Sequence, residues 1–177
     1  MSMPEGRLTL KVLNSMPIES ALERCGHFFE HSPWIVERAL SGRPFDSVRE
    51  FHRACLSAIG ESGREAQVKL IRAHPDLVGR LAKEGRLTGE STREQAEAGL
   101  DALSLEEIEL FERYNASYRG RFGFPFVICA RKNRKETILE AFPRRLTNDR
   151  EVEIETALEQ IGEIAWLRMS DAIESDR

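Results

Sequence analysis

The sequence has no apolar run of about 18 residues, the length typical of a membrane-spanning helix. Residues 1–16 carry scattered charges and no long apolar stretch, which is not the pattern of a secretory signal peptide. The last three residues, Ser-Asp-Arg, are not a peroxisomal address of the Ser-Lys-Leu type. We therefore expect a soluble, cytoplasmic protein that has no membrane partner.

Cysteine is scarce as well. Cys25, Cys55 and Cys129 are an odd number, widely spaced and without a C-x-x-C pair, which argues against a disulfide framework and a structural zinc site. His27 and His31 have the i, i+4 spacing of a metal pair, but the residue after His27 is Phe28 and not the Glu of the H-E-x-x-H signature. We predict no metal site, and we expect the cysteines to be buried in a reducing compartment.

Positive charge is not in excess, because the formal net charge is −4. An acidic protein exerts no broad attraction on nucleic acid or anionic lipid. A helical DNA-binding regulator would also need a basic recognition helix, and none is present. We therefore expect no nucleic-acid partner.

Alternation of apolar and polar residues with period 2 is almost absent, whereas apolar residues recur at helical spacing. The length and the 41% apolar content suit one compact domain. We predict an all-α fold in a single compact domain, residues 1–177, with about nine helices. The expected helices lie near 18–31, 33–41, 47–60, 64–73, 75–84, 91–102, 104–121, 133–142 and 149–170.

Three capping boxes support this reading. Each places a capping side chain three residues before a carboxylate: Ser91 with Glu94, Ser104 with Glu107, and Asn148 with Glu151. Each is expected to open a helix.

One short segment, residues 122–130, breaks the helical pattern. It is apolar and β-prone, and Pro125 pushes Phe124 toward extended geometry. The plain interpretation is a connector in the core. The alternative is a wall of a ligand site, because an extended segment in a helical protein has backbone amides that need partners.

Five residues are candidates for chemistry. His74 ends an apolar helix, and Pro75 after it is typical of the first residue of the next helix. A junction histidine can also be a cap or a packing residue. Ser91 and Glu94 are explained by their capping box, yet a helix N-terminus also offers N–H groups to anionic or carbonyl ligands, and Gln95 adds an amide. Arg168 lies in an apolar stretch, either as a snorkelling side chain or as a carboxylate clamp.

Taken together, these fragments resemble the 2-oxo-4-hydroxy-4-carboxy-5-ureidoimidazoline (OHCU) decarboxylase family. The resemblance depends on His-Pro-Asp-Leu at 74–77, Ser-Thr-Arg-Glu-Gln at 91–95 and Phe-Gly-Phe-Pro-Phe-Val-Ile-Cys at 122–129. Leu-Asn at 13–14, Ser-Pro-Trp at 32–34 and Ile-Ala-Trp-Leu-Arg at 164–168 also fit. The resemblance covers a core of about residues 12–170, and three motifs in order at the family spacing are specific.

The resemblance implies that His74 is the catalytic histidine and Glu94 its acidic partner. The substrate contacts that it implies are Pro75, Ser91, Thr92, Arg93, Glu94, Gln95, the backbone of Phe126, Val127, Ile128, Cys129 and Ala130, and Arg168. It also implies an all-α fold specific to the family, a homodimer and no cofactor. The implied reaction converts OHCU into S-allantoin, a step of urate degradation.

Our hypothesis is that His74, held by Glu94, acts as the acid/base while the other residues fix which face of the substrate receives a proton. Two alternatives remain open. One is a non-catalytic ureide-binding protein, because a pocket and a catalyst look alike in sequence. The other is a decarboxylase of a related ureidoimidazoline.

Overall fold

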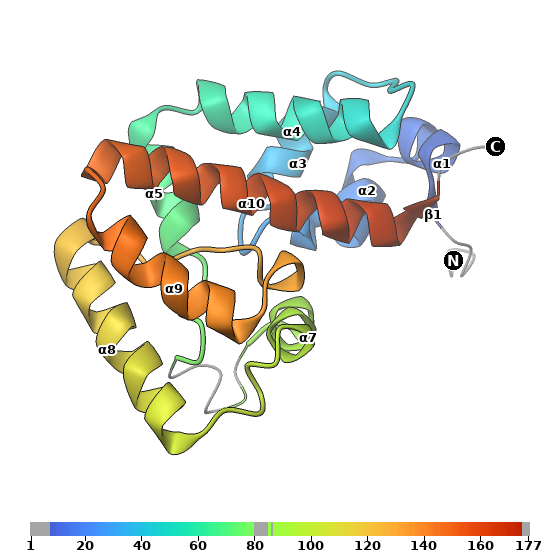
Figure 1. Ribbon diagram of the computed structural model, residues 1–177. Coiled ribbons are helices and arrows are strands. Elements are labelled where there is room, and N and C mark those ends of the chain that lie inside the picture. Colours follow the sequence, from blue (N-terminus) through green and yellow to red (C-terminus); the bar gives the residue numbers. More distant parts are fainter. Residues whose placement is uncertain (1–7, 80–84, 86, 175–177) are drawn as a thin grey trace. The chain divides into compact units, whose positions relative to one another are not determined.

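The computed structural model describes residues 8–79, 85 and 87–174, and these residues form the all-α protein that apolar spacing predicts (Figure 1). Nine α-helices lie within these ranges. The accompanying sheet is minimal: β1 (Leu8–Thr9) pairs in parallel with β2 (Ile173–Glu174). The chain divides into two compact units, residues 1–67 with 162–177 (unit 1) and residues 68–161 (unit 2). That residues 1–177 fold as one domain stays a prediction.

Unit 1 is built around the packing of α3 on α4. His52 on α4 is buried, and its Nε2 donates to the carbonyl oxygen of Gly162 at 2.8 Å. The Arg49 guanidinium lies 3.4 Å from the ring centre of Trp166. The helices of this unit are α1 (Leu10–Ser15), α2 (Ile18–Cys25), the 3-10 helix η1 (Gly26–Phe28), α3 (Trp34–Leu40), α4 (Val48–Glu61), the start of α5 (Arg64–Arg72) and the second part of α10 (Arg150–Ala172).

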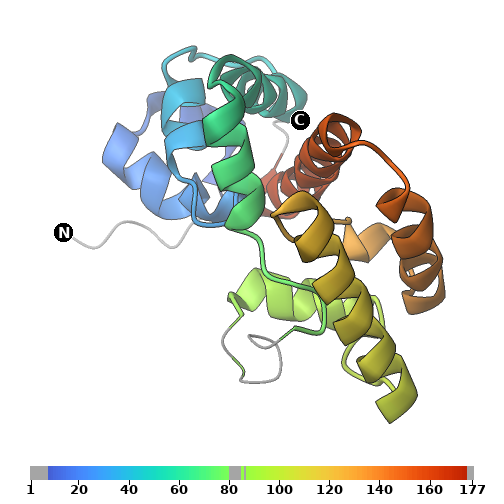
Figure 2. The same ribbon diagram turned by 90° about the vertical axis from the view of Figure 1, so that its left-hand side faces the viewer.

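Unit 2 contains the remainder of α5 and α10 together with four further elements (Figure 2). These are α7 (Gly89–Glu97), α8 (Leu105–Phe122), the 3-10 helix η2 (Ala130–Lys132) and α9 (Lys135–Leu146). Helix α8 packs on α9, and α7 packs beside η2 (Figure 1). Three buried rings, Tyr118, Phe126 and Phe142, join α8, the extended segment and α9. The core of unit 2 therefore includes Phe126 from the segment that precedes η2.

Several predicted helix limits were wrong. The helix expected over 18–31 ends at Cys25 and gives way to η1, and the short helix α1 was not expected. Helix α9 continues to Leu146, past the predicted end at 142, although Pro143 lies inside it and cannot donate a backbone hydrogen bond. No helix begins at Pro75: residues 75–79 form a turn, and residues 80–84 lie outside the described residues.

Of the three predicted capping boxes, the structure contains one in full. The box of Ser104 and Glu107 is confirmed, with Glu107 N–H donating to Ser104 Oγ at 3.1 Å. The box at Ser91 is wrong, since α7 begins at Gly89 and its cap is Thr88. The third helix, α10, begins at Arg150, and Asn148 donates from its side-chain amide to Glu153 instead.

Two further findings concern the cysteines and the search for membrane-spanning helices. All three cysteines are buried and unpaired, as predicted. Among the described residues, no helix is both long enough and apolar enough to cross a bilayer.

Candidate active site

His74 is buried two residues after the end of α5, where the sequence predicts the end of an apolar helix. Its backbone N–H donates to the Ile71 carbonyl at 3.1 Å, which closes the last turn. Its ring Nδ1 lies 3.0 Å from the Leu70 carbonyl oxygen, which can only accept. Nδ1 therefore carries a proton, and Nε2 is the nitrogen that can exchange one with a ligand.

The turn after His74 is held from two helices. The N–H of Val78 donates to Gln95 Oε1 of α7 at 3.1 Å, and Asn115 Nδ2 of α8 donates to the Leu77 carbonyl at 2.8 Å. Val78 has φ +53°, a left-handed conformation that is strained for a β-branched residue. At Gly79 an added Cβ would approach Asp76 Cβ to 2.6 Å, so this position has no room for a side chain.

Helix α7 presents three buried polar side chains, Ser91, Glu94 and Gln95, and packs beside η2. Burial raises the pKa of the Cys129 thiol, and the Glu94 carboxylate raises it further, so Glu94 lies near enough for its charge to act there. An ion pair between Arg131 and Glu97, 3.0 Å, also joins η2 to α7. The 74–79 turn, α7 and the segment before η2 therefore come together within unit 2.

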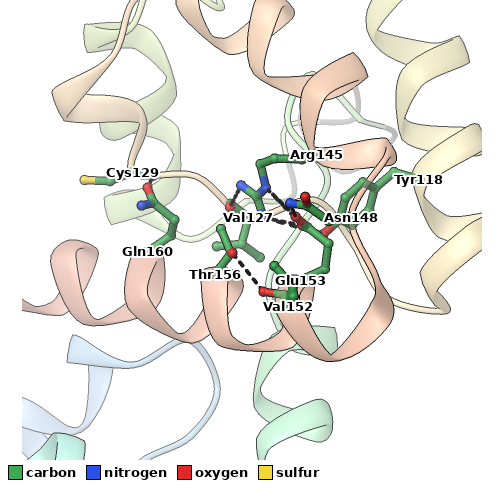
Figure 3. A network of polar contacts seen from close by, with 9 residues as sticks. All are labelled: Tyr118, Val127, Cys129, Arg145, Asn148, Val152, Glu153, Thr156 and Gln160. Atoms are coloured by element: carbon green, nitrogen blue, oxygen red, sulfur yellow. Dashed lines mark hydrogen bonds and ion pairs between the residues drawn. The ribbon is translucent and has the colours of Figure 1, made fainter.

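The helical pattern is interrupted near 122–130, as predicted, although Phe122 ends α8 and Ala130 begins η2; residues 123–129 between them form no helix or strand and are fixed at several points (Figure 3). The rings of Phe126 and Phe142 stack with centres 3.8 Å apart. The Val127 carbonyl accepts from Arg145 Nη1 at 2.7 Å, and the Cys129 N–H donates to Gln160 Oε1 at 2.9 Å.

Arg145, which binds the Val127 carbonyl of this segment, also belongs to a buried ionic network (Figure 3). Arg145 Nη2 and Glu153 Oε2 are 2.9 Å apart, and both side chains are almost fully buried. Tyr118 donates its hydroxyl to Glu153, and Asn148 Nδ2 donates to the same carboxylate at 2.8 Å. Burial raises the pKa of Tyr118, and its hydrogen bond to Glu153 raises it further, so the phenol stays protonated. A buried pair with this many partners holds the Val127 carbonyl in one position.

The backbone amides of this wall are only partly available to a ligand. The N–H of Cys129 donates to Gln160 Oε1 and is not available to a ligand. In contrast, no described residue accepts from the N–H groups of Val127 and Ile128. The N–H groups of Phe126 and Ala130 also have no acceptor among the described residues, so amides that can turn to a ligand lie on both sides of Cys129.

Arg168 belongs to unit 1 and has the acidic partner that its burial requires. Its Nη1 lies 3.1 Å from Glu30 Oε2 and 3.2 Å from the His27 carbonyl oxygen, with both charged side chains almost fully buried. Glu30 neutralises the guanidinium and fixes its orientation.

The remaining candidates differ in burial. Ser91 is buried on α7, and Pro75 and Ile128 are partly exposed. Thr92 and Arg93 are exposed: Thr92 Oγ1 donates to the Thr88 carbonyl, and Arg93 pairs with Glu97 at 3.9 Å.

Sequence reasoning missed the residues that support the site. These are Asn115, Gln160, Glu30 and the Tyr118, Arg145 and Glu153 network. A signal existed for Glu153, an acidic residue between Val152 and Ile154 near the start of an amphipathic helix. Nothing local marked Asn115, because its partner lies 38 residues earlier in the chain.

No group of three or more His, Cys, Asp or Glu side chains in the described part of the chain could hold a metal ion.

Comparisons with known proteins point to one family. The model of the OHCU decarboxylase family matches residues 14–170. The chain is 41% identical to the 2-oxo-4-hydroxy-4-carboxy-5-ureidoimidazoline decarboxylase of Haloferax volcanii, covering 96% of this chain and 98% of that protein. It is 38% identical to the protein of the same name from Amia calva, covering 94% and 95% of the two chains.

Solved structures agree. The crystal structure of an (S)-allantoin synthase is similar with a TM-score of 0.74 and 27% identity, over 94% of this chain and 54% of that one. A crystal structure of an OHCU decarboxylase with (S)-allantoin, at 22% identity and a TM-score of 0.62, shows the same fold over 77% of this chain and 88% of that one.

Proposed function

The chain belongs to the OHCU decarboxylase family, and from this membership we propose that it decarboxylates OHCU to S-allantoin without a cofactor. The observation that carries the proposal is the match across residues 14–170, which includes every motif that forms the candidate site. The buried arrangement of His74, Glu94 and Gln95 supports it, because buried polar groups that converge on one turn are typical of catalytic sites.

The reaction needs an acceptor for two electrons. The bond between the ring carbon and its carboxylate breaks, carbon dioxide leaves, and the electron pair moves toward the neighbouring C=N group of the substrate. The former imine nitrogen takes up a proton, the hydroxyl proton is lost as the decarboxylated carbon becomes a carbonyl, and the carbon bearing the ureido group gains a proton. The substrate supplies its own electron sink, so the protein has to orient groups and move protons.

His74 is the acid/base in this proposal. Its Nδ1 is committed to the Leu70 carbonyl, so Nε2 receives or delivers the proton. Glu94 stabilises the imidazolium that forms when Nε2 accepts the proton from the substrate hydroxyl.

Substrate binding falls to amide groups and one guanidinium. Gln95, Ser91 and the open N–H groups of Val127 and Ile128 hold the carbonyl groups of the ureido arm and the ring. Pro75 forms part of the same wall, and Thr92, Arg93, Phe126, Cys129 and Ala130 complete it. Arg168, oriented by Glu30, binds an anionic or carbonyl part of the substrate.

The decisive experiment is stereochemical. OHCU is generated from urate with the two upstream enzymes, this protein is added, and the circular dichroism of the allantoin is followed. The expected result is faster decay of OHCU with a signal of a single enantiomer, since a bound substrate is protonated from one face. Racemic allantoin at the uncatalysed rate would contradict the proposal.

The same assay separates the alternatives. A ureide-binding protein leaves the rate of OHCU decay unchanged even where it binds allantoin. A decarboxylase of a related ureidoimidazoline shows a higher kcat/KM for that relative than for OHCU.

Two further properties are proposed with the reaction. Activity should survive exhaustive treatment with metal chelators, and loss of activity that one added metal restores would contradict a cofactor-free mechanism. The protein should also be a homodimer, and light scattering during gel filtration measures its mass in solution. We further propose that it is cytoplasmic.

A further inference from the structure

Both polar groups of the peptide between Leu77 and Val78 are hydrogen-bonded to side chains. Its carbonyl accepts from Asn115 Nδ2 at 2.8 Å, and its N–H donates to Gln95 Oε1 at 3.1 Å. Asn115 is on α8 and Gln95 on α7, and both side chains are more than nine-tenths buried. Two primary amides from different helices therefore fix the plane of one peptide three to four residues after His74.

This arrangement is costly to the fold. Val78 is held at φ +53°, where a β-branched residue is strained. Asn115 Oδ1 is buried and, among the described residues, has no hydrogen-bond partner. The amide of Asn115 cannot be turned to relieve this, because its oxygen would then face the Leu77 carbonyl oxygen. Strain and an unsatisfied buried acceptor at one turn are typical of a site retained for function.

The three amide groups form a chain with a direction. Asn115 donates to the peptide carbonyl, the peptide N–H donates to the Gln95 carbonyl, and Gln95 Nε2 is the next donor. Hydrogen bonds in such a chain polarise one another, so each strengthens the donor that follows it. No described residue accepts from Gln95 Nε2. The chain therefore ends on a polarised N–H group in the candidate site.

We propose that Asn115 is a positioning residue that acts through the Leu77–Val78 peptide to make Gln95 a fixed hydrogen-bond donor toward the substrate. Because Oε1 is committed to Val78, Gln95 offers only N–H groups to a ligand, so this position selects a carbonyl oxygen and rejects an amino group. This inference rests on the proposed function, in which Gln95 contacts the ureido or ring carbonyl.

The first test uses the unmutated protein and nuclear magnetic resonance. Couplings across the two hydrogen bonds, from Asn115 Nδ2 to the Leu77 carbonyl carbon and from the Val78 nitrogen to the Gln95 side-chain carbonyl carbon, should both be present. Added S-allantoin should shift the Gln95 Nε2 proton resonance downfield. Absence of either coupling under conditions that reveal helical couplings, or a Gln95 resonance that does not respond to saturating allantoin, would overturn the inference.

The second test is Asn115→Leu, which keeps the volume and removes the donor. The Gln95 Nε2 proton should move upfield, binding of allantoin should weaken, and kcat/KM should fall about 10- to 100-fold. The matched control is Asn14→Leu in unit 1, where the side-chain amide also bonds backbone groups, donating to the Phe45 carbonyl and accepting from its N–H, each at 2.9 Å. The control should lower the melting temperature without moving the Gln95 resonance or the rate of folded protein.

These measurements separate two kinds of failure. If Asn115→Leu shifts the Gln95 resonance but the wild-type protein does not accelerate OHCU decay, the amide chain is real and the proposed function is wrong. If wild-type turnover is fast and Asn115→Leu changes neither the resonance nor kcat/KM, the inference about Asn115 is wrong and the proposed function stands.

Discussion

At the scale of residues, polar side chains of unit 2 repeatedly bind the backbone with one end. His74 Nδ1 faces the Leu70 carbonyl, Gln95 Oε1 accepts from Val78, and Gln160 Oε1 accepts from Cys129. Such a bond fixes the side chain and decides which end is left for a ligand. For Gln95 that end is Nε2, and for His74 the bond identifies Nδ1 as the protonated ring nitrogen.

His74→Asn tests the proposed acid/base. Asparagine can still donate to the Leu70 carbonyl, so the melting temperature should change little. Loss of the group that exchanges protons should lower kcat about 10²- to 10⁴-fold. Initial rates and melting curves on the same preparation measure both effects, and near-normal turnover by folded His74→Asn would remove His74 from the mechanism.

Glu94→Gln tests the acidic partner. Since α7 is capped by Thr88, the substitution leaves the start of the helix intact and removes only a buried carboxylate. The rate should fall by at least about 10²-fold in a normally folded protein. The matched control is Glu97→Gln on the same helix, where the lost ion pair to Arg131 is partly exposed and should cost at most about 1 kcal/mol with little effect on rate. Equal rates for the two variants would return Glu94 to a structural role.

His52 should make folding stability depend on pH. Burial lowers its pKa below the usual value of about 6.5, more than the hydrogen bond to Gly162 raises it. As pH falls, the unfolded chain therefore binds a proton at His52 before the folded protein does. Its contribution is fully present above about pH 6.5 and is lost as pH falls through that value toward the lower pKa of the folded state.

Urea unfolding at about pH 7.5 and about pH 5 measures this loss. His52→Gln can still donate to the Gly162 carbonyl but does not titrate, so its stability should fall less over the same interval. The same loss in both proteins would show that other groups are responsible.

At the scale of elements, glycines decide where helices can end and where a turn can close. Gly123 ends α8 with φ +78°, and its N–H donates to the Arg119 carbonyl at 2.9 Å. This left-handed residue redirects the chain from α8 into the extended segment of the site. Gly79 closes the turn after His74, where an added Cβ would collide with Asp76.

Two Gly→Ala substitutions should therefore have opposite signs. Gly79→Ala forces Asp76 and the turn apart and should destabilise the protein by about 1–3 kcal/mol, with loss of activity. Gly120→Ala lies inside α8 with nothing within 4 Å of the added Cβ, and should stabilise by about 0.5–1 kcal/mol. Urea unfolding of the two variants beside the wild type measures the change, and a shift of the same sign in both would contradict this account of the turn.

At the scale of the whole molecule, helices α5 and α10 each contribute residues to both units. Helix formation is cooperative along the chain, so unfolding of one part of such a helix weakens the other part. We therefore expect residues 1–177 to unfold as one domain, as the composition predicts.

The aromatic residues make this testable. Both tryptophans, Trp34 and Trp166, are in unit 1, and both tyrosines, Tyr114 and Tyr118, are in unit 2. Tryptophan fluorescence and the near-ultraviolet tyrosine signal should follow the same transition in urea. Gly79→Ala, which changes unit 2, should also move the tryptophan midpoint; separate midpoints would show two domains.

The sequence by itself determined the all-α class, most helix positions and the break in the helical pattern near 122–130, and it predicted His74, Glu94 and Gln95 as site residues. Periodicity, caps and motifs act over a few residues and can be seen in the chain. Only the tertiary structure decided which groups hold them: Glu30 pairs with Arg168 from 138 residues away, and Asn115 reaches Leu77 across 38. It also moved the cap of α7 from Ser91 to Thr88 and left Pro75 in a turn. These outcomes depend on desolvation and packing between segments that are distant in the chain, for which no local pattern exists.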